Sequence, residues 1–269
     1  MNNLYKNPYI LYENKEFILL YKPAKWSCDT DMDISHITKY PDNNKSITIY
    51  VKFYIHNYLP YKKSYGLLNR LDKETSGCVL VAKNKNGYFK LFKIVHIQKK
   101  ICKIYLCLTN NNIKKKQNYI KKSIKCDRQI IHKQTISKCN ITDKNNKQYI
   151  AKSYFYKIAK LEDDDKNEYT LFFVKIFTGK THQIRIHMKS LGCPLVSDYK
   201  YLDKEQYNEN LKISSRLFLH NIFYKFTYDN KIQEQIVPIP TDLLNTLSML
   251  KSKRKYNILD IPQELIDLV

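Results

Sequence analysis

The chain contains a five-residue apolar run, Cys78–Ala82, that directly follows a glycine. This run has the length of a buried strand, and Gly77 can adopt backbone conformations that other residues avoid. The polar residues just before it place Asp72 two positions after Arg70. A loop fixed to the end of a buried strand is held rigidly, as a catalytic group requires. The stretch 65–83 therefore predicts a core strand, with Asp72 as the first candidate for chemistry.

Further apolar segments show the periods of strands and helices. Alternating or continuous apolar runs predict strands at residues 10–12, 17–21, 101–108, 151–159, 169–177, 215–226 and 232–237. Helical spacing predicts a helix over Ile47–Tyr58, stopped by Pro60, and the beginning of another at Gln183. Because there is no internal repeat and no clear linker, we predict one α+β domain over residues 1–269, with a core at about 10–242 and a basic helical tail over 243–269.

Residues 84–98 predict an amphipathic helix with Asn84 as its N-cap. The predicted inner face is formed by Tyr88, Leu91, Phe92 and Val95. The predicted outer face carries Lys90, Lys93 and Lys99. In contrast, residues 109–150 are rich in Lys, Asn and Gln, which predicts a variable and only partly ordered excursion.

The 269 residues carry a formal net charge of +22, with 47 Lys and Arg against 25 Asp and Glu. This balance favours a polyanionic partner, most simply nucleic acid, because neutralising phosphates releases counterions. The alternative is a lysine bias along the whole chain, with the lysines serving only as solvated surface. Arginines are few, so Arg70 and Arg185 indicate positions that need a planar, bidentate donor.

The seven cysteines include no C-x-x-C pair and no zinc-finger spacing, which predicts reduced, mostly buried thiols in an intracellular protein. The amino terminus lacks the pattern of a signal peptide, and no window approaches the ~18 apolar residues of a membrane span. Consecutive acidic residues at Glu162–Asp165 predict a solvated hairpin tip rather than a metal site.

A second polar block runs from Thr178 to Tyr201. His182 and His187 are five residues apart, so they do not share a helical face as a zinc-binding pair would. We expect Arg185 to face Asp72, because an arginine partner would keep that carboxylate ionised and aim its oxygens. A glycosidase-like pair of carboxylates is a further hypothesis, for which Asp198 is the other candidate.

These two blocks carry a specific resemblance. Asn69–Gly77, followed by Ala82-Lys83, resembles the first signature of the RluA-type pseudouridine synthases, which isomerise uridine in RNA. Thr178–Arg185 resembles the second signature, which continues through Gly192, Pro194, Asp198 and Tyr201. Weaker similarities occur at Glu13–Pro23, Lys103-x-Tyr105, Leu219-His220 and Val237–Pro240. The resemblance covers roughly residues 10–242.

The resemblance implies a mechanism and a role for several residues. Asp72 would be the nucleophile that attacks the target uridine, and Arg185 would be its salt-bridge partner. Tyr105 would stack on the extruded uracil, and Arg70 would fill the gap that the flipped base leaves in the RNA. Base flipping costs a few kcal/mol, and stacking on an aromatic ring returns about 1–3 kcal/mol.

The resemblance also implies a pseudouridine synthase fold, with a mixed, largely antiparallel sheet, flanking helices and a central RNA-binding cleft. Lys180, Thr181 and His182 would contact RNA, either rRNA or tRNA. It implies no metal or organic cofactor. We further expect a monomer that does not associate with membranes, located in the cytoplasm or in an organelle.

Two residues depart from the family pattern. The first signature usually opens with His, where this chain has Asn69, and Lys25 stands where a glycine is common. No S4-type RNA-binding domain is predicted, so the lysine surface and residues 109–150 would supply the grip on RNA. A catalytically inactive RNA-binding protein of the same fold is therefore the alternative hypothesis.

Overall fold

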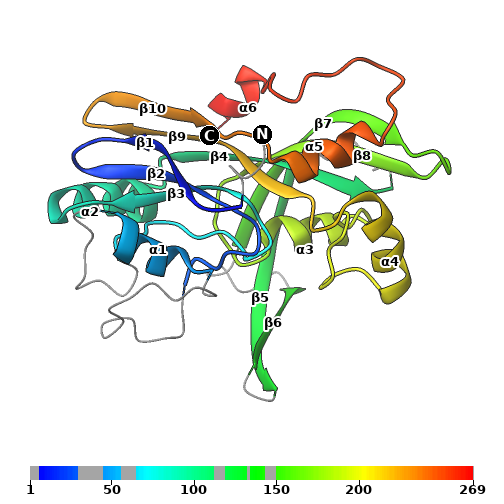
Figure 1. Ribbon diagram of the computed structural model, residues 1–269, viewed down its shortest axis with the longest axis horizontal. Coiled ribbons are helices and arrows are strands. Elements are labelled where there is room, and N and C mark those ends of the chain that lie inside the picture. Colours follow the sequence, from blue (N-terminus) through cyan, green and yellow to red (C-terminus); the bar gives the residue numbers. More distant parts are fainter. Residues whose placement is uncertain are drawn as a thin grey trace. The chain divides into compact units, whose positions relative to one another are not determined.

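The computed structural model describes residues 6–29, 45–55, 65–111, 119–131, 134–142 and 150–268, and within 125–142 it describes the backbone alone (Figure 1). The chain divides into two compact units, each discontinuous in sequence. The first unit comprises Met1–Lys103 and His220–Ile239, and the second comprises Ile104–Leu219 and Pro240–Val269. The expectation of a single domain stays a prediction.

The first unit contains a three-stranded antiparallel sheet in the order β1-β2-β3. Its strands are β1 (Tyr9–Glu13), β2 (Phe17–Lys22) and β3 (Gly77–Ala82). Every residue of β2 and β3 is buried, so both faces of these strands are covered. This explains why β3 reads in the sequence as a continuous apolar run rather than an alternating one. The predicted core strand at Cys78–Ala82 is confirmed.

Aromatic rings pack this sheet against a β-hairpin. The hairpin consists of β9 (Leu219–Tyr228) and β10 (Lys231–Ile236), and residues from His220 onward belong to the first unit. Phe17 meets Phe226 and Tyr228 edge to face, with ring centroids 5.5 and 5.1 Å apart. Such pairs add to the stabilisation that comes from apolar burial alone.

The helix predicted over 84–98 is present. Asn84 caps α2 (Lys85–Phe92) by accepting a hydrogen bond of 2.9 Å from the Gly87 amide, and the π-helix η1 (Lys93–Gln98) continues it. Leu91 is fully buried as predicted, whereas Phe92 is 38% exposed, so its predicted inward orientation is wrong. Phe92 lies one residue beyond Leu91, about 100° around the helix, and this turns its side chain outward.

A further helix among the described residues of the first unit is α1 (Ile47–Tyr54). It confirms that a helix begins at Ile47, but it ends at Tyr54 and not at the predicted Tyr58, because Ile55 has extended backbone with φ −108° and ψ 115°. Pro60, the predicted stop, lies outside the described residues. Across the described part of the chain, no helix is both long and apolar enough to cross a membrane.

The second unit holds an antiparallel sheet in the order β4-β8-β7-β5-β6. The strands are β4 (Ile101–Asn110), β5 (Tyr119–Ile131), β6 (Gln134–Thr142), β7 (Ile150–Glu162) and β8 (Glu168–Ile176). In Figure 1, β5 and β6 run side by side as a long hairpin. The prediction of a variable, partly ordered excursion over 109–150, with weak β signals at Ile130-Ile131 and Thr135-Ile136 alone, did not anticipate the length of these strands. The pairing of β5 with β7, which the local composition does not encode, organises them.

Four helices accompany this sheet: α3 (Gln183–Ser190), α4 (Lys204–Ile213), α5 (Thr241–Ser248) and α6 (Gln263–Asp267). Helix α4, which was not predicted, is capped by Asp203, whose carboxylate accepts a hydrogen bond of 2.8 Å from the Gln206 amide. Ile186 of α3 packs with Ile124 and Ala151, and this fixes the helix on β5 and β7. The α+β class, with antiparallel sheets and flanking helices, is confirmed.

Candidate active site

The loop that carries Asp72 is fastened on both sides within the first unit. Upstream, the Leu71 amide donates to Sγ of the buried Cys28 at 3.3 Å. Downstream, the Thr75 amide donates to the Asp72 carbonyl at 3.0 Å, and the Lys25 amide donates to the Lys73 carbonyl at 2.7 Å. Asp72 itself is half-buried. The loop is therefore a rigid turn that keeps its carboxylate partly accessible, as the sequence predicted.

A buried lysine is hydrogen-bonded to the backbone of the same loop. Lys22 is fully buried, and its ammonium donates to the carbonyls of Pro23, Trp26 and Lys73 at 2.8, 2.7 and 3.2 Å. Three carbonyl oxygens offset the loss of hydration that burial of the charge would otherwise cost. The weak similarity at Glu13–Pro23 thus corresponds to a support for the backbone next to Asp72.

Asn69, which departs from the family pattern, is hydrogen-bonded to strand β3. Its side-chain oxygen accepts a hydrogen bond of 2.7 Å from the Leu80 amide and one of 3.3 Å from the Tyr224 hydroxyl, and its Nδ2 donates to the Cys78 carbonyl at 3.4 Å. An amide side chain can both donate and accept in this way. The Asn69 substitution is therefore compatible with an ordered signature loop.

The beginning of β3 is anchored to β9. The Ser76 hydroxyl and Nδ1 of His220 lie 2.9 Å apart, and the Asn221 amide donates to the Ser76 carbonyl at 2.9 Å. Gly77 has φ +141°, and a Cβ there would lie 2.5 Å from the Asn221 Cβ. Only glycine fits this approach without displacing backbone. The weak family similarity at Leu219-His220 lies at this contact between β3 and β9.

Arg70 projects from the same loop into solvent. Its side chain is 58% exposed and forms an ion pair with Asp29, which is 52% exposed. Exposed ion pairs of this kind contribute at most about 1 kcal/mol to stability, so the Arg70 guanidinium can leave Asp29 for a stronger anion at little cost. A planar guanidinium can bind a phosphate or fill a gap in a stack of RNA bases.

In the second unit, the predicted turn at Thr178–Thr181 leads into α3. Gln183 holds this turn, because its side-chain oxygen accepts from the Thr178 hydroxyl at 2.8 Å and the Lys180 amide at 3.1 Å. Its Nε2 donates to the Lys152 carbonyl at 2.8 Å. The turn leaves Thr181 exposed and Lys180 half-buried. Both side chains are thus accessible to a ligand.

Arg185 forms a buried, bidentate ion pair with Asp198. Nε and Nη2 of Arg185 donate to the two carboxylate oxygens at 2.8 and 2.5 Å, and the two side chains are 2% and 0% exposed. Sequence reasoning missed this pair, although both residues belong to one polar block. The pair argues against Asp198 as an acid or base in glycosidase-like chemistry, because its oxygens are already engaged.

Tyrosines surround this ion pair. The Arg185 guanidinium carbon lies 5.1 Å from the Tyr201 ring centroid and 6.0 Å from that of Tyr199. The Tyr201 hydroxyl lies 2.8 Å from Nδ1 of His182, which is 8% exposed. His182 is thus buried in a structural contact, and its predicted contact with RNA stays a prediction.

Tyr105 lies on β4 and is 5% exposed. Lys103 lies two residues earlier and so shares its face of the strand. The Lys103 ammonium is 6.0 Å from the Tyr224 ring centroid, and burial lowers the pKa of Lys103 to about 8. Burial also lowers the pKa of His187 in α3 to about 4, with a smaller contribution from Lys122.

The predicted residues therefore fall into two groups. Arg70 and Asp72 belong to the first unit, and the second unit contains Tyr105, Lys180, Thr181, His182 and Arg185. The pairing of Asp72 with Arg185 and its approach to Tyr105 stay predictions. The described residues contain no group of three or more His, Cys, Asp or Glu side chains that could hold a metal ion.

Comparison with known proteins decides the family. The family model described as RNA pseudouridylate synthase matches residues 16–190, a range that includes both signatures. The chain belongs to the RNA pseudouridylate synthase family. The resemblance to the RluA type is thereby confirmed.

Relatives in this family agree with the assignment. Ribosomal large subunit pseudouridine synthase C of Rickettsia felis is 33% identical over 213 residues, which cover 79% of this chain and 60% of that protein. An uncharacterized RNA pseudouridine synthase of Haemophilus influenzae is 29% identical over 222 residues, which cover 82% and 83%. The chain thus spans about 60% of the length of its Rickettsia relative.

Solved structures of the pseudouridylate synthase family share the fold. Human RNA Pseudouridylate Synthase Domain Containing 1 aligns with a TM-score of 0.70 and 18% identity, covering 98% of this chain and 97% of that one. Human RNA Pseudouridylate Synthase Domain Containing 4 aligns with a TM-score of 0.63 and 17% identity, covering 90% and 93%. At these identities the similarity establishes the fold alone.

Proposed function

We propose that the protein isomerises specific uridines in RNA to pseudouridine, with Asp72 as the nucleophile. The observation that carries this proposal is the presence of both signatures within the family match at 16–190, each held by hydrogen bonds in its own unit. Asp72 occupies the aspartate position of the first signature. Arg185 occupies the arginine position of the second.

The reaction is an isomerisation and needs no co-reactant. The bond from N1 of uracil to C1′ of the ribose breaks, the base turns, and a bond forms between C5 and C1′. C5 loses a proton and N1 gains one, so atoms and electrons balance. A carboxylate that attacks the nucleotide divides this difficult step into two easier ones. Arg185 would keep the Asp72 carboxylate charged and oriented.

The target base must leave its stack before Asp72 can reach it. Flipping costs a few kcal/mol, which stacking of the uracil on Tyr105 would offset in part. Arg70 is exposed and only weakly held by Asp29, so it is available to occupy the gap left by the base. Lys180, Thr181 and His182 would contact the RNA near the second signature. The name of the Rickettsia relative supports large-subunit rRNA as the substrate class, with tRNA as the alternative.

The inactive RNA-binding protein is less well supported. Its main support was Asn69 in place of histidine, and the Asn69 side chain makes three ordered hydrogen bonds around β3. Lys25, the other departure, has φ +67°, and its amide holds the Lys73 carbonyl beside Asp72. Neither substitution removes a group that the proposed reaction uses.

A pseudouridine map of total RNA, made with and without the protein, tests the proposal. Carbodiimide adducts on pseudouridine stop reverse transcription, so each modified position gives a discrete signal. We expect one or more uridines to lose the signal when the protein is absent and to regain it when the wild-type chain is restored. An unchanged map of rRNA and tRNA would contradict the proposal and favour the inactive RNA-binding protein.

A further inference from the structure

Helix α2 and the π-helix η1 carry a row of aromatic rings. The rings of Tyr88 and Phe92 stack with centroids 5.9 Å apart and planes 26° apart, and the His96 ring follows with its centroid 4.7 Å from that of Phe92. The spacing of four residues places these rings on one side of the helix. Phe89 and Phe92 are 53% and 38% exposed. The row thus presents aromatic surface to solvent in an already stacked arrangement.

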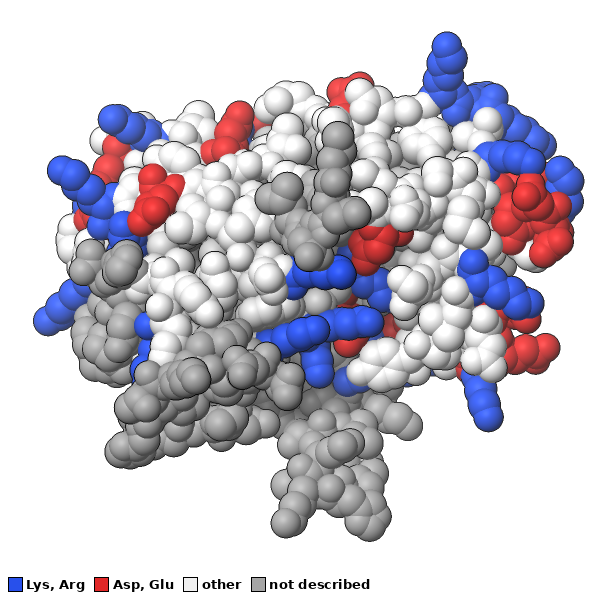
Figure 2. Space-filling view, in the orientation of Figure 1, with Lys and Arg blue, Asp and Glu red and all other residues white. Residues whose placement is uncertain are grey.

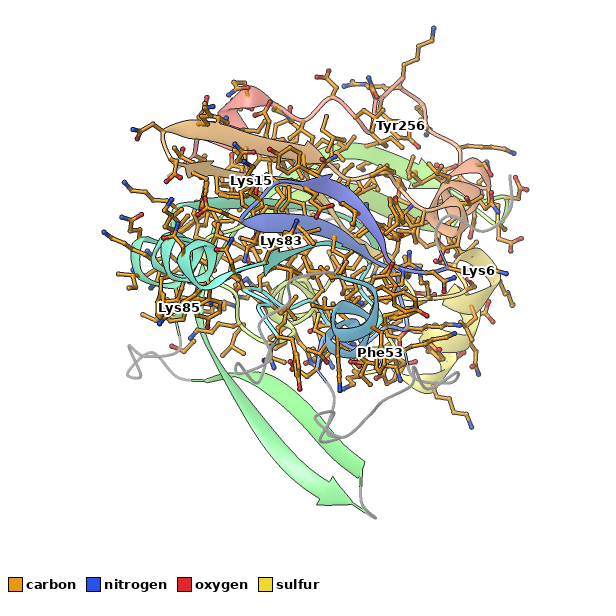
Figure 3. All side chains as sticks on the ribbon, turned by 60° about the vertical axis from the view of Figure 1, so that its left-hand side comes forward. Lys6, Lys15, Phe53, Lys83, Lys85 and Tyr256 are labelled. Carbon is orange, nitrogen blue, oxygen red and sulfur yellow. The ribbon has the colours of Figure 1, made fainter. Side chains whose placement is uncertain are left out.

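Lysines flank this row. Lys85, Lys93, Lys99 and Lys100 are all exposed, and none of them forms an ion pair with any acidic residue that the structure describes. Figure 3 labels Lys85, and side chains of α2 project outward beside it. The chain has no Asp or Glu anywhere between residues 75 and 126. On the same helix, Lys90 forms ion pairs with Glu16 and Asp229. The other four lysines have no such partner among the described residues, and their excess positive charge favours a polyanion over an apolar protein partner.

The same surface begins close to the Asp72 loop, within the first unit. The His96 ring lies beside the backbone of Leu68, which is four residues before Asp72. Four residues span at most about 14 Å even when fully extended. Single-strand sites of one small domain accommodate about 4–16 nucleotides, so one RNA strand can reach both places.

We propose that this surface, the α2 face formed by Lys85, Phe89, Phe92, Lys93, Lys99 and Lys100, binds the single-stranded RNA that flanks the target uridine. The lysines would neutralise phosphates, and the phenylalanine rings would stack on bases. Every base has an aromatic face, so this grip tolerates different sequences and leaves the choice of uridine to the catalytic site. The proposal rests on the proposed function, because it takes the RNA substrate as the ligand.

Two triple variants of the full chain separate local from total charge. Lys93, Lys99 and Lys100 are changed to Gln in one, and the exposed Lys160, Lys204 and Lys255 are changed to Gln in the other. Each lowers the net charge from +22 to +19, since three positive charges are removed. Fluorescence anisotropy with labelled oligouridylate of about 16 nucleotides measures Kd over a series of salt concentrations. We expect the α2-face variant alone to lower the slope of log Kd against log salt by about 2.

The aromatic contribution needs a variant that keeps apolar character. Changing Phe89 and Phe92 to Leu retains a similar helix propensity and apolar surface but removes the flat rings. We expect it to weaken binding of the single strand by roughly fivefold to hundredfold, and to leave binding of a blunt RNA duplex unchanged, because paired bases cannot lie on the rings. Thermal unfolding midpoints near that of the wild type would verify that each variant is folded.

Two results would overturn the proposal. Equal changes in the two triple variants would mean that only total charge matters. Wild-type affinity for the single strand in the Leu variant would mean that the rings do not stack on bases, as expected of a surface that serves a protein partner. The assay measures binding and not isomerisation. A wild-type chain that grips the strand through the α2 face but forms no pseudouridine would refute the proposed function and leave this inference intact.

Discussion

At the scale of single residues, the ion pair of Arg185 and Asp198 is the most buried charged contact of the candidate site. Both side chains are almost completely removed from water. Removing one partner of such a pair leaves an uncompensated charge in the interior, which costs far more than losing an exposed pair. The chain offers a matched comparison, because Arg216 and Asp242 form a similar pair in which Asp242 remains 41% exposed.

We predict that Asp198→Asn lowers the free energy of unfolding by about 3–5 kcal/mol, because the buried Arg185 charge loses its bidentate carboxylate partner. Asp242→Asn should cost less, since water reaches the Asp242 end of that pair although Arg216 is only 4% exposed. Urea denaturation of the three proteins measures both values. Equal losses in the two variants would show that burial of the Arg185 pair is not what stabilises the second unit.

His187 provides a test that depends on pH. Its Nδ1 lies 3.0 Å from the Ser153 hydroxyl, its Nε2 has no hydrogen-bond partner among the described residues, and burial lowers its pKa to about 4. The unfolded chain binds a proton at this residue below about pH 6.5, whereas the folded chain does so only below about pH 4. Stability should therefore fall as the pH drops from 6.5 to 4.

We predict that His187→Asn, which can keep a bond to Ser153 but cannot titrate, removes roughly 2–3 kcal/mol of this loss over the same range. Comparing urea denaturation of the wild type and the variant at several pH values isolates the contribution of His187, because all other titrating groups are shared. Parallel curves for the two proteins would contradict the lowered pKa of His187.

At the scale of elements, β3 and the loop before it form the rigid frame of the first signature. Gly77 approaches Asn221 so closely that a methyl group would meet its backbone nitrogen and oxygen, each at 2.9 Å. Gly179, in the turn of the second signature, has no atom within 4 Å of an added Cβ and no positive φ. The two glycines therefore differ in what they permit, although both lie in signature turns.

We predict that Gly77→Ala lowers the free energy of unfolding by more than about 3 kcal/mol, because backbone atoms of β9 would have to move. Gly179→Ala should change it by less than about 1 kcal/mol in either direction. Thermal unfolding monitored by circular dichroism measures both. A Gly77→Ala protein as stable as the wild type would refute the close contact between β3 and β9.

Elements with strong local signals could be predicted from the sequence, and those organised by distant partners could not. The continuous apolar run of β3 and the N-cap of α2 at Asn84 are local features, and both are confirmed. Strand β5 was missed because its partner β7 lies beyond a lysine-rich stretch. The outward turn of Phe92 depends on the register of α2 against the sheet, which apolar spacing alone fixes only to within one residue.

The candidate site follows the same rule. Asp72, Tyr105 and Arg185 could be proposed as site residues because each lies in a short motif that resembles the family. The contacts that support the Asp72 loop could not be predicted. The Lys22 ammonium and the Asn69 side chain bind backbone atoms, and a sequence motif does not show which backbone atoms a side chain will meet. The ion pair of Arg185 with Asp198 was missed because the acid expected to face Arg185 was Asp72, in the other signature.

At the scale of the whole molecule, the proposed catalytic set draws on both units. Asp72 belongs to the first unit, while Tyr105 and Arg185 belong to the second. Lysine and arginine side chains are distributed over the visible face in Figure 2, and acidic side chains are fewer. With a net charge of +22, RNA affinity should depend on many cations at once, whereas chemistry should depend on one carboxylate.

The most direct test of the account is therefore to compare Asp72→Asn with the wild type on RNA that the wild type modifies. Asp229→Asn is the control, because Asp229 lies in the same unit and its side chain is 55% exposed. We predict that the control forms pseudouridine like the wild type, and that Asp72→Asn forms none while its Kd for the RNA stays within about twofold. Undiminished pseudouridine in the Asp72→Asn product would contradict the central claim that Asp72 is the nucleophile.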